Sequence, residues 1–263
     1  MLAEIVWHPN PDALDLGVLK IQWYGISWGL GLLAVYFIGT YVFRILRKDE
    51  EHIVMAIQYA FIGGLLGARV GHILFYQLDF YMAHPQKIIA VWEGGLASHG
   101  GMVGALIALL LFCHRYRSYS YLFMMDITAI CIPLFCSLVR LGNLMNSELV
   151  GKITGSNYGF VFPAYGMEPR HPVVLYESIA YLTLQFVMLY LFKIYRDTKP
   201  ASYSIVMLVG IFGLRFLIEF FKEPEGMIFF GTISKTQMLN VPFILLGVAL
   251  FILMRTRKLT YNT

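Results

Sequence analysis

The sequence predicts an all-α polytopic membrane protein with seven transmembrane helices. Of its 263 residues, 58% are hydrophobic and 14% are charged, which is too apolar a composition for a soluble domain. Apolar runs of about 20 residues, the length that crosses a bilayer core, recur along the chain. Such runs must be helical, because lipid offers the backbone no hydrogen-bond partners. We therefore expect one integral membrane domain over residues 1–263.

In chain order, the expected spans cover residues 22–43, 53–76, 96–113, 121–140, 173–192, 203–221 and 238–254. Two connections are unusual. Segment 77–95 mixes aromatic and polar residues, which is typical of an interfacial helix or an arm on the membrane surface. Segment 149–172 is rich in Gly, Pro, Tyr and Phe, and it is expected to form a small strand–turn structure. Connections of this length are usually functional.

Lysine and arginine indicate the orientation of the spans. One set of connections carries eleven of them: Arg44, Arg47, Lys48, Arg115, Arg117, Lys193, Arg196, Lys199, Arg255, Arg257 and Lys258. The opposite set carries six: Lys20, Lys87, Lys152, Arg170, Lys222 and Lys235. By the positive-inside rule the N-terminus lies outside and the C-terminus is cytoplasmic. The net charge of +4 therefore indicates topology rather than nucleic-acid binding.

The second span carries glycines at four-residue spacing. Gly63, Gly67 and Gly71 leave one helix face without side chains, so that another helix can approach closely. We expect a helix–helix contact there.

Polar residues inside the spans gather at one level. With the orientation above, the following lie near the outer end of their helices: Tyr24, Arg69, His72, His99, Arg140, Asn143, Glu148, His171, Glu177, Arg215, Glu219 and Gln237. Polar groups in a span are costly unless they meet partners or a cavity, and purely structural ones would scatter through the depth of the bilayer. Their convergence predicts a site that faces the outer leaflet.

The residue types suggest an anionic lipid as ligand. Guanidinium groups pair bidentately with phosphate, and a phospholipid or a polyprenyl phosphate fits equally well. Gly100 and Gly101, which follow His99, would let backbone or substrate come close. Structural alternatives stay open, because Arg215 and Glu219 are four residues apart and suit an ion pair, and His99 suits a helix cap.

The segment "RLGNLMNSE" (140–148), at the end of the fourth expected span, carries several polar residues. Helical spacing places Arg140, Asn143 and Ser147 on a common face, so that they form a polar stripe. Gly142, in the middle of the stripe, leaves open a helix break that would disrupt it.

Five ordered segments resemble one protein family. They are "IQWYGISW" (21–28), "WEGGLASHGGMVGALIA" (92–108), "RLGNLMNSELVGKIT" (140–154), "RHPVVLYES" (170–178) and "GLRFLIEFFKEPEG" (213–226). Together they resemble the signature segments of the prolipoprotein diacylglyceryl transferases and span almost the whole chain. The chain departs from the family in having Val139 and Ser147 where glycine is common, and "SKTQ" (234–237) in place of an SMGQ-like segment.

The resemblance implies an activity and its partners. The family transfers the diacylglyceryl group of phosphatidylglycerol to the lipobox cysteine of a prolipoprotein signal peptide, which leaves a thioether and releases glycerol phosphate. It works in the bacterial cytoplasmic (inner) membrane among membrane lipids, without a metal or other cofactor and without nucleic acid. This is the first step of bacterial lipoprotein maturation.

The resemblance also implies roles for individual residues. His99, Arg140 and Arg215 match the family's catalytic positions. Tyr24, Asn143, Asn146, Glu148 and Glu219 match further functional positions, and we add Arg69 to this substrate-binding group because it lies at the same level of the bilayer.

The alternative from another class is a transporter or flippase for an anionic lipid or polyprenyl phosphate. Such proteins usually show repeat symmetry and bind substrate near the bilayer midplane at broken helices, and the sequence has neither pattern. An intramembrane protease would need a Ser–His pair, paired aspartates or metal ligands at membrane depth. The sequence therefore favours the transferase.

Overall fold

The computed structural model describes residues 5–17, 20–91, 94–196, 198–223, 228–229 and 233–256. The chain divides into two compact units. The first comprises the described residues up to Gly39 and those from Met125 onward, and the second comprises Thr40–Met124. The boundaries fall inside helices α1 (Trp23–Ile45) and α5 (Tyr121–Met145), which give their longer parts to the first unit.

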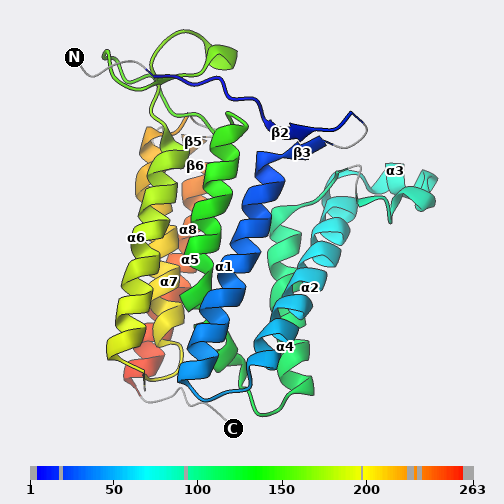
Figure 1. Ribbon diagram of the computed structural model, residues 1–263, viewed down its shortest axis with the longest axis vertical. Coiled ribbons are helices and arrows are strands. Elements are labelled where there is room, and N and C mark those ends of the chain that lie inside the picture. Colours follow the sequence, from blue (N-terminus) through cyan, green and yellow to red (C-terminus); the bar gives the residue numbers. More distant parts are fainter. Residues whose placement is uncertain are drawn as a thin grey trace. The chain divides into compact units, whose positions relative to one another are not determined.

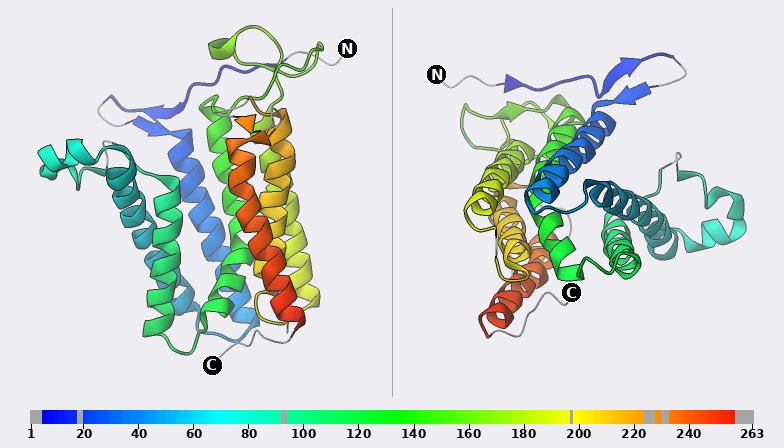
Figure 2. Two further views of the ribbon diagram at one scale, coloured as in Figure 1. Left: turned by 180° about the vertical axis from the view of Figure 1, so that it is seen from behind. Right: turned by 60° about the horizontal axis from the view of Figure 1, so that its bottom comes forward.

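The first unit is a helical bundle. Besides α1 and α5 it contains α6 (Val173–Ile194), α7 (Ser202–Ile218), which is continued by the 3₁₀ turn η4 (Glu219–Phe221), and α8 (Lys235–Arg255). Helix α7 packs against both α6 and α8, and Figure 2 shows α7 and α8 side by side.

Short strands cover one end of this bundle (Figure 1). Strand β1 (Ile5–Val6) runs parallel to β4 (Phe160–Val161), while β2 (Asp12–Asp15) pairs with β3 (Lys20–Gln22) and β5 (Ile228–Phe229) with β6 (Ile233–Ser234) as antiparallel pairs. Together with η3 (Pro163–Tyr165), β4 confirms the strand–turn structure predicted within residues 149–172. A small apolar core of Leu144, Val150, Phe162 and Val174 attaches this layer to the ends of α5 and α6.

The second unit is built on helices α2 (Glu50–Tyr76) and α4 (Ser98–Arg115), which lie side by side in Figure 2. A Cβ at Gly63 or Gly67 would overlap the backbone of α4 at Gly104 or Gly100. The helix–helix contact predicted from the glycine spacing is therefore confirmed. In the connection that joins α2 to α4 along the chain, α3 (Leu78–Ala83) and η1 (Pro85–Lys87) supply the helical structure expected in segment 77–95.

The glycines after His99 were expected to let either backbone or substrate come close, and the structure shows the first of these. Gly100 lies against Gly67 and Gly71, and Gly101 lies against Gly64 and Ala68. Both glycines therefore serve the close packing of α4 on α2.

Six helices in the described part of the chain are long and apolar enough to cross a membrane: α1, α2, α5, α6, α7 with η4, and α8. The expected span at 96–113 corresponds to α4, a shorter apolar helix. The largest boundary difference is in α5, which continues to Met145 rather than ending at residue 140.

Gly142 does not break α5. A Cβ there would lie 3.0 Å from Ser27 Cβ and 3.1 Å from Tyr24 Cα, so this glycine allows α1 to pack closely against α5. Of the expected polar stripe, Arg140 and Asn143 therefore lie on one continuous helix, but α5 ends at Met145, so Ser147 lies beyond the helix.

Candidate active site

The end of α5 is shaped by a helix-terminating turn. Ser147 N–H bonds to Leu144 O at 3.0 Å and Glu148 N–H bonds to Asn143 O at 3.1 Å, which is the bond pattern of a Schellman motif. The motif needs a left-handed residue, and Ser147 takes this place with φ 53°. This conformation explains why glycine suits the position, since a side chain there costs about 1–2 kcal/mol. The turn brings Glu148 back over the helix end.

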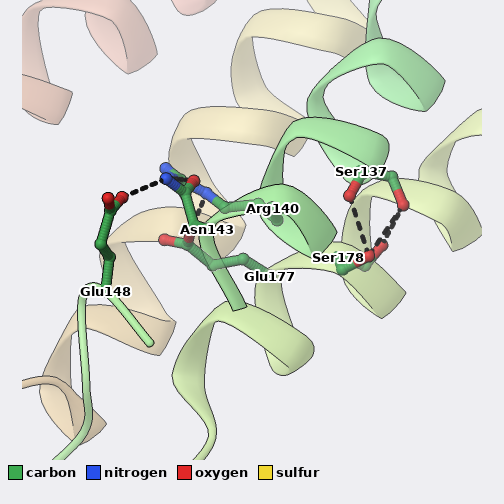
Figure 3. Close-up of polar contacts among 6 residues, drawn as sticks. All are labelled: Ser137, Arg140, Asn143, Glu148, Glu177 and Ser178. Carbon is green, nitrogen blue, oxygen red and sulfur yellow. Dashed lines mark hydrogen bonds and ion pairs between the residues drawn. The ribbon is translucent and has the colours of Figure 1, made fainter. Parts of the chain in front are cut away.

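Glu148 and two amides form a hydrogen-bonded group at the end of α5, and Figure 3 shows Glu148 with one of these amides, Asn143. Asn143 Nδ2 donates to Glu148 Oε2 at 2.9 Å, and Asn146 Nδ2 donates to Glu148 Oε1 at 3.0 Å. Because its amide nitrogen is held by Glu148, Asn143 turns its Oδ1 to Arg140, whose Nη1 donates to it at 3.1 Å. The carboxylate thus orients the amide, and the amide orients the guanidinium.

Arg140 also forms an ion pair across the helix interface. Its Nε donates to Glu177 Oε2 on α6 (Figure 3), and the two side chains are 15% and 8% exposed. The sequence placed Glu177 at the right level, but the prediction did not include it among the site residues. An acidic residue inside an apolar helix was the available signal, because such a residue needs a partner.

A small cavity of about 10 Å³ lies beside this ion pair. Its lining comprises Arg140, Leu149, Val173, Val174, Glu177, Arg215, Ile218, Glu219 and Lys222. Three basic and two acidic side chains therefore meet within a mostly buried space. Lys222, only 8% exposed, is a further residue that the prediction did not include.

Arg215 is the least satisfied of these cations. Its Nε is buried and has no hydrogen-bond partner among the described residues. A buried donor without a partner is costly, so this nitrogen is available to an incoming acceptor.

Glu219 is not the ion-pair partner of Arg215. Ser234 Oγ donates to Glu219 Oε1 at 3.1 Å, and Ser234 also caps α8 in a reciprocal capping box with Gln237. Within the described residues, no ion pair or hydrogen bond joins Arg215 to Glu219. The structure thus decides the open alternative, and Glu219 ties the end of α7 to the start of α8.

Tyr24 reaches the site region through the backbone of α1. It is the second residue of that helix, and its Cα packs against Gly142, next to Asn143.

Arg69 lies in the second unit and has a different set of partners from the one expected. All five of its N–H donors bond to main-chain carbonyls of one loop: Lys87, Ile88, Ala90, Gly94 and Gly95, at 2.5–3.2 Å. Its guanidinium also stacks over Tyr81, 4.9 Å from the ring centroid. Since every donor is occupied, Arg69 has none left for a phosphate, and the structure does not support its predicted place among the substrate ligands.

His99 is the second residue of α4. Its side chain lies outside the described part of the structure, so its expected role stays a prediction.

The site can attract and hold an anionic oxygen. Arg140 and Arg215 supply permanent positive charge on two helices, α5 and α7, and Lys222 adds a third cation. In a space of low polarity such charges act more strongly than in water. A phosphate group, whose oxygens match the guanidinium fork, is the ligand that this arrangement favours.

Comparison with known sequences gives a consistent result. The family model described as prolipoprotein diacylglyceryl transferase matches residues 11–253. Three relatives bear the name phosphatidylglycerol–prolipoprotein diacylglyceryl transferase. The one from Tolumonas auensis is 37% identical over 97% of this chain and 99% of its own length. The one from Bacteroides fragilis is 36% identical over 94% of both chains, and the one from Chloroherpeton thalassium is 38% identical over 94% and 92%.

The match covers the ends of α5, α6 and α7, where the site residues lie. The resemblance seen in the five sequence segments is confirmed over nearly the full length of the chain. This chain belongs to the prolipoprotein diacylglyceryl transferase family.

Proposed function

We propose that this protein transfers the diacylglyceryl group of phosphatidylglycerol to the lipobox cysteine thiol of prolipoproteins. The observation that carries the proposal is a cavity lined by Arg140 and Arg215, together with the buried Nε of Arg215, which has no partner among the described residues. The names of the relatives supply the two substrates, and the arginines supply the means to bind the anionic one.

In the proposed reaction the cysteine sulfur attacks the carbon of the diacylglyceryl group that bears the phosphate ester. A C–S bond forms as the C–O bond breaks, and the bonding electron pair leaves with the phosphate oxygen of glycerol phosphate. Arg140 and Arg215 bind this phosphate and stabilise the charge that develops on it. Donors aimed at developing charge are usually the largest contribution to catalysis.

The thiol proton is assigned to His99. A free cysteine has a pKa near 8.5, so at neutral pH most of it is the weakly nucleophilic thiol and a base speeds the attack. A His99→Gln variant with the wild-type transfer rate would remove the base from the mechanism and leave the phosphate-binding role of the arginines untouched.

The remaining site residues position the head group. Asn143 and Glu148 hold Arg140 in place through the hydrogen bonds described above, while Asn146, Tyr24 and Glu219 frame the region around the arginines. Glu177 pairs with Arg140. A bound phosphate competes with this carboxylate for the guanidinium.

We further propose seven membrane spans, an outside N-terminus and a cytoplasmic C-terminus in the bacterial cytoplasmic membrane. The 18 residues of α4 rise about 27 Å, which is close to the thickness of a hydrocarbon core of about 30 Å. The bias of Lys and Arg supports this orientation. In this orientation the arginine site faces the outer leaflet.

A direct test is transfer of radiolabelled glycerolipid from phosphatidylglycerol to a lipobox peptide by purified protein in detergent. We expect a thioether-linked product with wild-type protein and at least about 100-fold less with Arg140→Ala, because loss of one such donor typically costs 10²–10³ in rate. A protein that moves phosphatidylglycerol between leaflets of vesicles but forms no thioether would instead be a flippase.

A further inference from the structure

Helix α5 contains a buried proline, Pro133, two turns before Arg140. Proline lacks an N–H, and its ring displaces the preceding turn, so a helix is opened or kinked there. Backbone groups freed in an apolar interior must find other partners, since each unsatisfied group costs several kcal/mol.

Gln185 of α6 supplies those partners. Its side chain is 2% exposed. Its Oε1 accepts a hydrogen bond from Leu134 N–H at 3.0 Å, and its Nε2 donates to Ile130 O at 2.9 Å. An unbroken helix would pair these two groups with each other. The amide of Gln185 thus bonds to both groups of α5 beside the proline.

Two further links fix α5 to α6 between the proline and the site. Ser137 Oγ donates to Ser178 O at 2.8 Å and Ser178 Oγ donates to Ser137 O at 3.0 Å, and the ion pair of Arg140 with Glu177 follows one turn later (Figure 3). The direction of α5 beyond Pro133 is therefore set by α6.

We propose that Gln185 is a positioning residue for Arg140, because it bridges the opening at Pro133 and so fixes the direction in which α5 presents the guanidinium. This inference rests on the proposed function. Seven residues separate Pro133 from Arg140, a rise of about 10 Å, so a change of about 10° in helix direction moves Arg140 by about 2 Å. A displacement of about 1 Å is enough to lower a rate about 100-fold.

The test is a double-mutant cycle of Gln185→Leu and Pro133→Ala. Gln185→Leu keeps the side-chain volume but removes both hydrogen bonds, and we expect turnover to fall at least tenfold. Pro133→Ala restores the missing N–H and lets α5 close on itself, so Gln185 becomes dispensable. The double variant should transfer lipid within about threefold of Pro133→Ala alone. A residue that only filled space would show no such rescue.

Hydrogen exchange of residues 128–145 gives a readout that does not depend on the reaction. Exchange should rise in Gln185→Leu and return in the double variant, even if the wild-type protein transfers no lipid and the proposed function fails. Gln58→Leu, at an exposed position of α2, is the matched control and should change neither turnover nor exchange.

Wild-type turnover and exchange in Gln185→Leu would overturn the proposal, as would a double variant as impaired as the single one. If Gln185→Leu does not accumulate as folded protein, the double variant decides: the proposal requires it to accumulate and to transfer lipid, and failure to do so overturns it.

Discussion

Arg69 and Arg215 are both arginines near the end of an apolar helix, but they have opposite environments. Arg69 gives all five donors to main-chain carbonyls of residues 87–95, whereas the buried Nε of Arg215 has no partner in the described chain. The residue type is the same, and the hydrogen-bond acceptors differ. An arginine in a membrane helix is therefore a ligand or a structural residue according to whether its donors are already occupied.

The largest expected effect concerns the unsatisfied arginine. Arg215→Lys keeps the charge but removes the fork that matches phosphate, and we expect transfer to a lipobox peptide to fall about 100-fold or more. The melting temperature should change little, because Arg215 Nε has no hydrogen-bond partner among the described residues. If Arg215→Lys transferred lipid at the wild-type rate, the phosphate would not be bound by Arg215, and the two arginines would not differ in role.

Arg69→Lys should give the reverse result. An ammonium group has three donors and leaves at least two of the five carbonyls without a bond, so we expect a loss of about 3 kcal/mol in unfolding free energy at about 1.5 kcal/mol for each lost bond to a charged group. Thermal unfolding measures this, with KM for phosphatidylglycerol on the folded fraction as the second readout. If KM rose while stability stayed at the wild-type value, Arg69 would be a substrate ligand after all.

A smaller effect is expected at the turn that carries Glu148. Ser147 has φ 53°, so Ser147→Gly should raise stability by about 1 kcal/mol through relief of backbone strain and leave transfer unchanged. Ser118→Gly, at an exposed loop position outside the left-handed region, is the control and should be neutral or slightly destabilising. A loss of stability in Ser147→Gly would argue that the hydroxyl has a role of its own.

The smallest expected effect is a pH dependence of stability. Burial lowers the pKa of His171 below its usual 6.5, so the folded protein binds fewer protons here than the unfolded chain. The stabilisation is complete above pH 6.5 and is lost as the pH falls through the lowered pKa. His171→Gln should therefore make thermal stability less dependent on pH between about 7 and 5. An unchanged slope would show that other groups control acid unfolding.

The helices and the level of the site were predictable from sequence because both depend on local pattern. Apolar runs located α1, α2 and α5–α8. Polar residues within these runs indicated the end of the helices at which Arg140, Arg215 and Glu219 line one cavity. Hydrogen-bond partners were not predictable in the same way. The partners depend on which helices pack together and in what register, and helix periodicity does not encode this. Examples are the pairing of Glu177 with Arg140, of Ser234 with Glu219, and of Gln185 with the backbone of α5.

The environment of Arg69 could not be read from residue type and position along a helix. Arg69 was grouped with the substrate-binding residues, but its acceptors come from a loop about 20 residues further along the chain. Gly100 and Gly101 were expected to admit either backbone or substrate, and the structure shows the close approach of the α2 backbone. The Ser147 position was better signalled, since a glycine preference at a helix end indicates a left-handed residue.

The central claim is that Arg140 and Arg215 bind the lipid phosphate while Arg69 holds main chain. The most direct measurement is a structure of the protein with bound phosphatidylglycerol. We predict phosphate oxygens within hydrogen-bond distance of Arg215 Nε and of the Arg140 guanidinium, with Arg69 still bonded to the carbonyls of residues 87–95. A phosphate bound by Arg69, with Arg215 Nε still unpartnered, would contradict the account.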